Sequence, residues 1–271
     1  MRQFKLYNSL GQVYNLNDMA SFFHDPKGLG FDDDGKYERI GNQYIATQEG
    51  IKQAEPEGKI RFLDYVEFNN FAKFIQCQPL KLQYSAADTY YMDVIVKKIE
   101  KTEIENIGLD VSIKFSALGQ WYKDIIKSIS NEALVGKVYP YEYPYTYADD
   151  TQGSVEIESD SGEESPVKIT IMGPCVNPNW THYVNGNVVE TGKMNCTVPE
   201  GKRLEISSIL PYSIRELDAF NNVVADRYQK SDFSTERFVK LQHGINIISI
   251  THEGTEPLRA VVEGMIYYAT I

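Results

Sequence analysis

The chain of 271 residues carries 27 basic and 38 acidic side chains, which gives a formal net charge of −11. This surplus of acid argues against extended binding to nucleic acid or to an anionic membrane, because both need clustered Lys and Arg. Hydrophobic residues make up 42% of the sequence, and a chain of this length can bury a core without a metal or a disulfide. The composition therefore predicts a globular protein of one large domain or two ordinary ones.

The first half of the sequence contains short segments that alternate apolar and polar residues, which is typical of strands with one buried face. A polar, turn-rich loop is predicted over residues 29–41. The predicted strands of this half are residues 4–7, 13–16, 44–47, 58–62, 80–84, 92–99 and 109–115.

One helix is predicted over residues 64–76. Asp64 is its expected N-cap, and Glu67 three residues later completes a capping box. Pro79 follows the helix and stops it before the next strand. A second short helix is predicted over residues 121–130. The apolar face expected to seal the sheet consists of Tyr65, Phe68, Ala72 and Ile75.

A domain boundary is predicted near Gly136, which divides the chain into residues 1–136 and 137–271. The segment after this boundary places tyrosine at every second position and interrupts the run with prolines, which do not suit a central strand. One interpretation is an edge strand or linker whose rings cover a core, and the other is an aromatic subunit interface. The tyrosines are Tyr139, Tyr141, Tyr143, Tyr145 and Tyr147.

The second domain is predicted to be all-β, with about eight short strands in a two-sheet sandwich. The dipeptide Asn185-Gly186 between two apolar pairs is a strong hairpin signal. Residues 153–166 are acidic and weakly apolar, and a mobile loop is expected there. Further strands are predicted at residues 167–171, 204–206, 213–215, 245–250 and 261–268.

Motifs for catalysis or for metal and cofactor binding fail in this sequence. It has no nucleophile elbow and no phosphate-binding loop. The segment Asp32-Asp33-Asp34-Gly35 has Gly30 where a calcium loop needs its first ligand, so we interpret it as a solvated turn. The three cysteines match no zinc spacing and are expected to be free buried thiols, which fits folding in a reducing cytosol. We therefore predict no catalytic, metal or cofactor residues.

No signal peptide or membrane anchor is predicted, because the N-terminus lacks an apolar core and no apolar run approaches the length of a membrane span. A binding hypothesis remains for Trp180, His182 and Tyr183, which lie together in the second half. Trp180 and Tyr183 could stack on sugar rings. Alternatively, Trp180 fills the core.

The most informative segment runs from Leu80 to Lys123. It contains an L-x-L-x-Y strand, a Tyr-Tyr-x-Asp-Val strand from Tyr90, an Ile-Glu-Lys-Thr-Glu turn from Ile99 and a Leu-Gly-x-Trp-Tyr motif from Leu118. Residues 28–31 add a Gly-Leu-Gly-Phe turn, and further matching motifs occur at 166–174, 177–178, 185–186 and 241–246. In order and spacing these motifs resemble the siphovirus distal tail proteins, the baseplate hub subunits at the tip of long phage tails.

The resemblance implies a mostly β fold with one or two short helices. It implies a sandwich-like N-terminal domain that forms a hexameric ring, and a galectin-like or jelly-roll C-terminal sandwich for docking. The expected partners are other copies of the chain, the tail tube protein, a tail-associated adhesin or lysin and a receptor-binding protein. DNA would only pass through the ring. The expected location is the virion tail tip of a phage or prophage, after assembly in the host cytoplasm.

Two functions from other classes stay open beside this structural role. In the first, the C-terminal sandwich is a sugar-binding adhesin that recognises the host cell wall. In the second, the chain is a glycan-active enzyme, which the sequence supports less because no convincing carboxylate pair can be placed.

Overall fold

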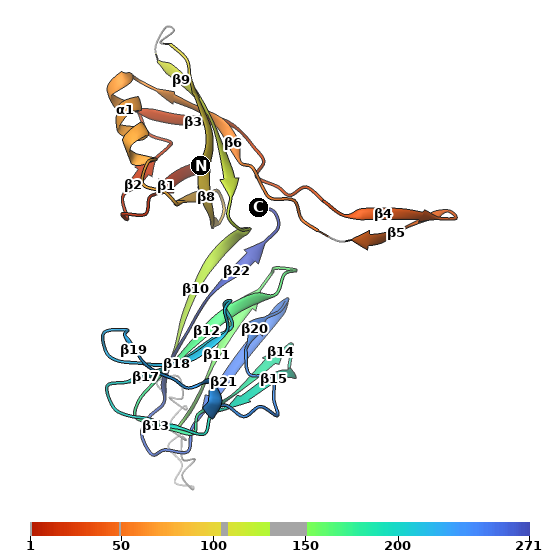
Figure 1. Cartoon of the computed structure of the whole chain (residues 1–271), viewed down its shortest axis with the longest axis vertical. Coiled ribbons are helices and arrows are strands. Elements are labelled where there is room, and N and C mark those ends of the chain that lie inside the picture. The colour runs from red at the N-terminus through yellow and green to blue at the C-terminus, as the bar shows by residue number, and fades with distance from the viewer. Residues whose placement is uncertain (1, 49, 104–107, 131–150) are drawn as a thin grey trace, which may run out of the picture. The chain divides into compact units, whose positions relative to one another are not determined.

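The computed structural model describes residues 2–48, 50–103, 108–130 and 151–271, and these are mostly in strands. The chain forms two compact units (Figure 1), one of Met1–Lys123 with Tyr267–Ile271 and one of Asp124–Ile266. The predicted boundary near Gly136 lies outside the described residues, so the division into 1–136 and 137–271 stays a prediction. In the structure the last five residues belong to the first unit.

The first unit is built around one antiparallel ladder, in which neighbours follow the order β2-β1-β7-β8-β9-β6-β3. Its elements in chain order are β1 (Gln3–Tyr7), β2 (Val13–Asn15), β3 (Ser21–Lys27), β4 (Lys36–Ile40), β5 (Gln43–Gln48), β6 (Glu57–Phe62), α1 (Tyr65–Phe74), β7 (Leu80–Ser85), β8 (Thr89–Lys101), β9 (Leu109–Ala117) and the start of β10 (Trp121–Ser130).

Strand β9 shows how the alternating sequence makes this core. Every second side chain of Leu109–Ala117 is buried, starting with Leu109, and the residues between them are half-buried. The buried set packs with Phe4, Leu6, Ile60 and Phe62 of other strands in one apolar cluster. The predicted strand at residues 109–115 is therefore confirmed.

Helix α1 covers this cluster and begins as predicted, because the Asp64 carboxylate accepts a hydrogen bond of 2.9 Å from the Glu67 amide. The predicted apolar face was wrong in part. Phe71 and Phe74 are buried, whereas Tyr65 is exposed. Phe68 and Ile75 of the predicted face do pack against the core, and Phe71 and Phe74 complete the side of the helix that the sheet meets.

Two sequence predictions in this half were wrong. Residues 121–130 form strand β10 instead of a helix, and Tyr122 pairs with Tyr91 of β8. The β-branched residues Ile125, Ile126 and Ile129 suit a strand. The predicted loop at residues 29–41 contains strand β4, because Gly41 turns the chain at a φ of 63° and lets β4 pair with β5.

The second unit contains two antiparallel sheets that both contribute to its core. One has the order β19-β18-β17-β12-β22, and the other β11-β21-β14-β15. Its elements are β11 (Gln152–Ser159), β12 (Ser165–Met172), β13 (Cys175–Val176), β14 (Asn179–Val184), β15 (Asn187–Lys193), β16 (Thr197–Val198), β17 (Arg203–Ser207), β18 (Ser213–Leu217), β19 (Val223–Asp226), a 3-10 turn at Tyr228–Lys230, β20 (Lys240–Leu241), β21 (Gly244–Thr251) and most of β22 (Arg259–Tyr268).

The predicted hairpin at Asn185-Gly186 is confirmed, since both residues have positive φ and connect β14 to β15. The loop expected within residues 153–166 is limited to the connection between β11, which ends at Ser159, and β12, which begins at Ser165, and its mobility stays a prediction. Val155 and Ile157 point into the core while the acidic residues between them face outward. The acidic residues of this segment therefore lie on the exposed face of a strand.

Candidate assembly interface

Strands β4 and β5 form a two-stranded arm, defined here as residues 36–48, which extends away from the sheet of the first unit (Figure 1). Every side chain of both strands is exposed. Among the described residues, neither strand pairs with a further strand. An isolated two-stranded ribbon is marginally stable in water, so a surface that packs against the arm would stabilise it.

Each face of the arm carries exposed apolar side chains beside polar ones. Its cross-strand pairs place Ile40 and Ile45 on one face and Tyr37 and Tyr44 on the other. Their exposed fractions are 61% for Ile40, 49% for Ile45, 55% for Tyr37 and 71% for Tyr44. Large apolar side chains exposed on both sides of a ribbon are typical of a segment that contacts another chain.

The base of the arm is held by short-range bonds. The Asp34 amide donates to Gly50 O at 3.0 Å, and the Lys52 amide donates to Asp32 O at 2.9 Å. Asp33 accepts from the Tyr37 hydroxyl and from the Gly35 amide, and these two bonds lower the pKa of its carboxyl. The triple-aspartate segment is exposed, as predicted, but it is not a turn, because Asp33 pairs with Ile51 in an antiparallel bridge at the base of the arm.

An apolar cavity of about 250 Å³ opens beside this base, within the first unit. Trp121 closes one side of it, and its indole N–H donates to Leu29 O at 3.0 Å. The apolar lining includes Phe31, Ile51, Ala54, Met92, Leu118 and Trp121. Its lining has the chemistry to accept an apolar side chain from another molecule.

The charged residues near the arm are largely paired within the chain. Glu55 accepts from Lys114 at 2.7 Å and also from Lys97. Hydrogen bonds from Lys114 and then Lys97 lower the pKa of Glu55 to about 2. Beside these carboxylate–ammonium pairs, the exposed apolar groups of the arm and the cavity are available for contacts with another chain.

None of the residues singled out from the sequence belongs to residues 36–48. Tyr139, Tyr141, Tyr143, Tyr145 and Tyr147 are outside the described residues, so their role stays a prediction. Trp180 is only 1% exposed and lies across from Gly192 on β15, as the core-filling alternative expects. Tyr183 is half-buried on the same strand. Sugar stacking by Trp180 and Tyr183 is untested.

A different aromatic group lies at the surface of the second unit, and sequence reasoning missed it. The rings of Tyr212 and Phe238 stack at 4.7 Å between centroids, and Tyr228 links Phe238 to Phe233. The Arg237 guanidinium lies 4.4 Å from the Phe233 centroid. Tyr212 comes from a separate segment, so the one signal that the sequence offers is the five-residue spacing of Tyr228, Phe233 and Phe238.

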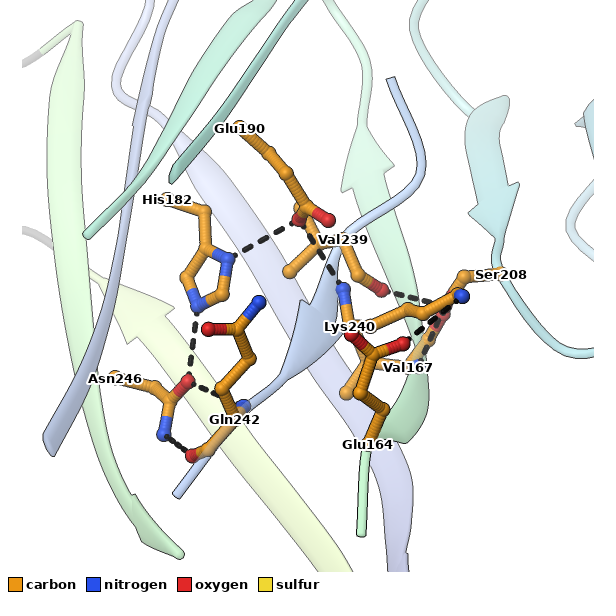
Figure 2. A network of polar contacts seen from close by, with 9 residues as sticks. All are labelled: Glu164, Val167, His182, Glu190, Ser208, Val239, Lys240, Gln242 and Asn246. Atoms are coloured by element: carbon orange, nitrogen blue, oxygen red, sulfur yellow. Dashed lines mark hydrogen bonds and ion pairs between the residues drawn. The ribbon is translucent and has the colours of Figure 1, made fainter. Parts of the chain in front are cut away.

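The second unit also holds a buried polar network (Figure 2), which is the part of the described structure that most resembles a reactive site. His182 lies between Glu190 at 3.1 Å and Asn246 at 3.0 Å. Ser208 belongs to the same network but donates its hydroxyl to backbone oxygens, including Val167 O at 2.8 Å. Ser208 is thus not paired with His182 as a nucleophile with its base would be.

Among the described residues, no three His, Cys, Asp or Glu side chains are arranged to hold a metal ion. Cys77, Cys175 and Cys196 are free thiols, and burial raises the pKa of Cys175 to about 12. In the described part of the chain, no helix is long and apolar enough to cross a membrane.

Comparison with known families decides the class of the first unit. Residues 3–118 match the family model of the distal tail protein, N-terminal domain. This region is a distal tail protein domain. The match contains the arm, helix α1 and the motifs from Leu80 to the Ile-Glu-Lys-Thr-Glu turn, and it confirms the predicted resemblance.

Solved structures show that the distal tail fold extends over the whole chain. One neighbour is a chain of the phage P2 baseplate in its activated conformation with Ca, with a TM-score of 0.62, 15% identity and complete coverage of both chains. The other is the Dit protein of phage SPP1, described as a paradigm of the hub adsorption apparatus, with a TM-score of 0.63, 10% identity and coverage of 97% of this chain and 98% of that one. No curated protein sequence matches the chain.

Proposed function

We propose that this chain is a structural hub subunit at the distal tail of a long-tailed phage or prophage. The match of residues 3–118 to the distal tail domain carries this proposal. The subunit is made and assembled in the host cytoplasm and resides at the tail tip of the virion. Its role is assembly and host attachment, with no bond-breaking step.

The first unit forms a hexameric ring through its arm. The exposed apolar faces of residues 36–48 and the apolar cavity beside the arm are complementary in chemistry, which supports contact between neighbouring copies. A closed ring pairs or covers strand edges without open-ended growth. In this arrangement each arm is stabilised by the next subunit.

The ring joins the tail tube protein on one side to a tail-associated adhesin or lysin on the other, and the second unit docks a receptor-binding protein. Six chains with a net charge of −11 each carry about −66 in total. The share of this charge that faces the central hole repels DNA, so that DNA passes without binding.

Electron microscopy of the assembled tail tip tests the ring. We expect six copies around the tail axis, with the first units next to one another. A three-fold or asymmetric arrangement of this subunit at the end of the tube would refute the ring and the channel argument with it.

A matched pair of variants tests the arm. The double substitution Tyr44→Ser with Ile45→Ser removes apolar groups from both faces, and we expect tails that carry it to lack the ring. Glu38→Gln changes an exposed residue of the same arm and keeps its apolar groups, so it should assemble normally. If both variants form rings equally well, the arm is not the interface.

The surface aromatic group of the second unit supports a second candidate function, a sugar-binding adhesin. Tyr212 and Phe233 are exposed aromatic rings, and the Arg237 guanidinium beside Phe233 adds a hydrogen-bond donor. Titration of the full chain with host cell-wall glycans, followed by calorimetry, tests this candidate. Binding that is lost in Tyr212→Ala and Phe233→Ala, but kept in the exposed control Phe220→Ala, would support it. If the parent chain does not bind these glycans, the adhesin function is refuted and the hub role remains.

A further inference from the structure

The buried network of the second unit encloses a histidine between two oxygen atoms. His182 is fully buried on β14, and its Nδ1 lies 3.1 Å from Glu190 Oε2 on β15. Its Nε2 lies 3.0 Å from Asn246 Oδ1 on β21. Figure 2 shows the ring between these two side chains. Both ring nitrogens therefore meet a hydrogen-bond acceptor.

The orientation of the Asn246 amide is set by its other bonds. Its Nδ2 donates to Gln242 O at 2.7 Å and to Gly244 O at 3.0 Å. Its Oδ1 accepts from the Gln242 amide at 2.9 Å. An inverted amide would break all three bonds, so Oδ1 must face the ring and His182 Nε2 must carry a hydrogen.

The position of the Glu190 carboxylate is also set by a second contact. Its Oε2 accepts from the Lys240 amide at 3.2 Å as well as facing His182 Nδ1. A neutral imidazole has one N–H and one lone pair. If Nε2 carries the hydrogen and Glu190 is ionised, the Nδ1 lone pair meets a carboxylate lone pair in a buried site, which is costly.

From this geometry we propose that the second unit folds around one trapped proton, which is shared between His182 Nδ1 and Glu190. The proton resides on the imidazole or on the carboxyl group, and in both cases the pair is neutral as a whole. It satisfies all the contacts described above. A neutral histidine beside an ionised glutamate lacks this proton.

The trapped proton connects the two sheets of the second unit. Glu190 and His182 belong to the β11-β21-β14-β15 sheet, whereas Lys240 begins β20, which pairs with β12 of the other sheet. Asn246 binds the turn that leads from β20 to β21. Loss of the proton is expected to loosen β20 and this turn from β15.

The other charged and titratable groups around the network have partners of their own. Lys240 Nζ lies 3.1 Å from Glu164 Oε2 near the surface, and this bond raises the pKa of Lys240. His243 Nδ1 lies 3.2 Å from Ser161 O. Neither interaction supplies a donor to Glu190 Oε2 or removes the need for a proton at His182 Nδ1.

The direction in which stability changes with pH follows from the number of protons that the folded and unfolded states bind. In the unfolded chain, histidine loses its second proton above a pH of about 6.5 and glutamate is ionised. Above that pH the folded state holds one proton more than the unfolded state, so stability falls as pH rises. One proton corresponds to about a tenfold rise in the unfolding equilibrium constant per pH unit.

The test uses the full chain in a Trp121→Phe background, where Trp180 is the remaining tryptophan and reports on the second unit. In Glu190→Gln the amide can donate to neutral His182, so no extra proton is needed. Between pH 7 and 9, we expect the ratio of the parent's unfolding constant to that of Glu190→Gln to rise about tenfold per pH unit. The control Glu164→Gln should keep the parent's pH slope. Equal slopes for the parent and Glu190→Gln would overturn the proposal.

Nuclear magnetic resonance of the unmodified chain gives an independent answer if Glu190→Gln does not fold. At pH 8 we expect His182 to be protonated on both ring nitrogens, or Glu190 to carry a protonated carboxyl group. An unprotonated ring nitrogen together with an ionised Glu190 would overturn the trapped proton.

Discussion

The arm of the first unit and the buried network of the second unit depart from the usual distribution of side chains in opposite ways. The arm exposes Tyr44 and Ile45, whereas the network buries His182 and Asn246 completely. Inside the network each polar group finds a partner from the same chain. A two-stranded ribbon has no core in which its apolar side chains can be buried. The comparison teaches that the network is satisfied within its own chain, whereas the apolar groups of the arm stay exposed in the single chain.

The largest expected effect is in the body of the first unit, where the contrast with the arm is strongest. Phe71 is fully buried, and its ring centroid lies 5.2 Å from Phe62 and 5.1 Å from Tyr14. Phe71→Ala should reduce the free energy of unfolding by about 3–5 kcal/mol. Chemical denaturation measures it. The exposed control Val66→Ala on the same helix should stay within about 0.5 kcal/mol. A loss below about 1 kcal/mol for Phe71→Ala would mean that α1 does not cover the core.

The next effect probes close packing in the second unit. Gly192 lies under the indole of Trp180, and a Cβ atom at this position would overlap Cε2 and Cζ2 of that ring. Gly192→Ala should cost about 1–3 kcal/mol, because the indole has to move. Gly162→Ala is the matched control, since a Cβ atom at that position would meet nothing within 4 Å. Thermal unfolding of both variants, followed by Trp180 fluorescence, checks this prediction, and equal midpoints would contradict it.

A smaller effect concerns a second buried polar group. Glu216 is buried and accepts from Lys202 Nζ at 2.8 Å and from Arg227 Nε at 2.8 Å. Burial favours a raised pKa, but these two cations outweigh it and the pKa of Glu216 is lowered. Glu216→Gln should cost about 1–2 kcal/mol at neutral pH.

The pH dependence of this effect has a definite sign. Because the folded pKa of Glu216 is lowered, its stabilisation is present above the unfolded value of about 4.3 and is lost as pH falls below it. The difference in stability between the parent and Glu216→Gln should therefore shrink in acid. The exposed control Glu236→Gln should show no such trend. A difference that grows in acid would contradict the assignment.

The smallest effect on folding is expected in the arm itself. Tyr44→Ser with Ile45→Ser removes no buried contact from the isolated chain, so the free energy of unfolding should change by about 0.5 kcal/mol or less. Denaturation of dilute protein measures this. A loss above about 2 kcal/mol would show that the arm packs within its own chain, and the comparison between arm and network would fail.

The amino-acid sequence determines the local parts of this fold. Alternation over Leu109–Ala117, the cap at Asp64 and the turn at Asn185-Gly186 depend on neighbouring residues, and the structure has all three. The motifs from Leu80 to Leu118 are likewise short local patterns, and their order was enough to predict the distal tail family.

Other features depend on residues far apart in the chain. The isoleucines of residues 121–130 suit a strand, but its pairing with Tyr91 of β8 depends on residues far apart, and local propensity does not contain that information. The burial of Trp180 depends on Gly192 of the neighbouring strand. The contact at His182 Nε2 depends on Asn246, which is 64 positions away. The spacing of residues in the sequence does not show which of these long-range contacts form. Long-range pairing brings these residues together, and the energy of a buried polar group depends on which partners surround it.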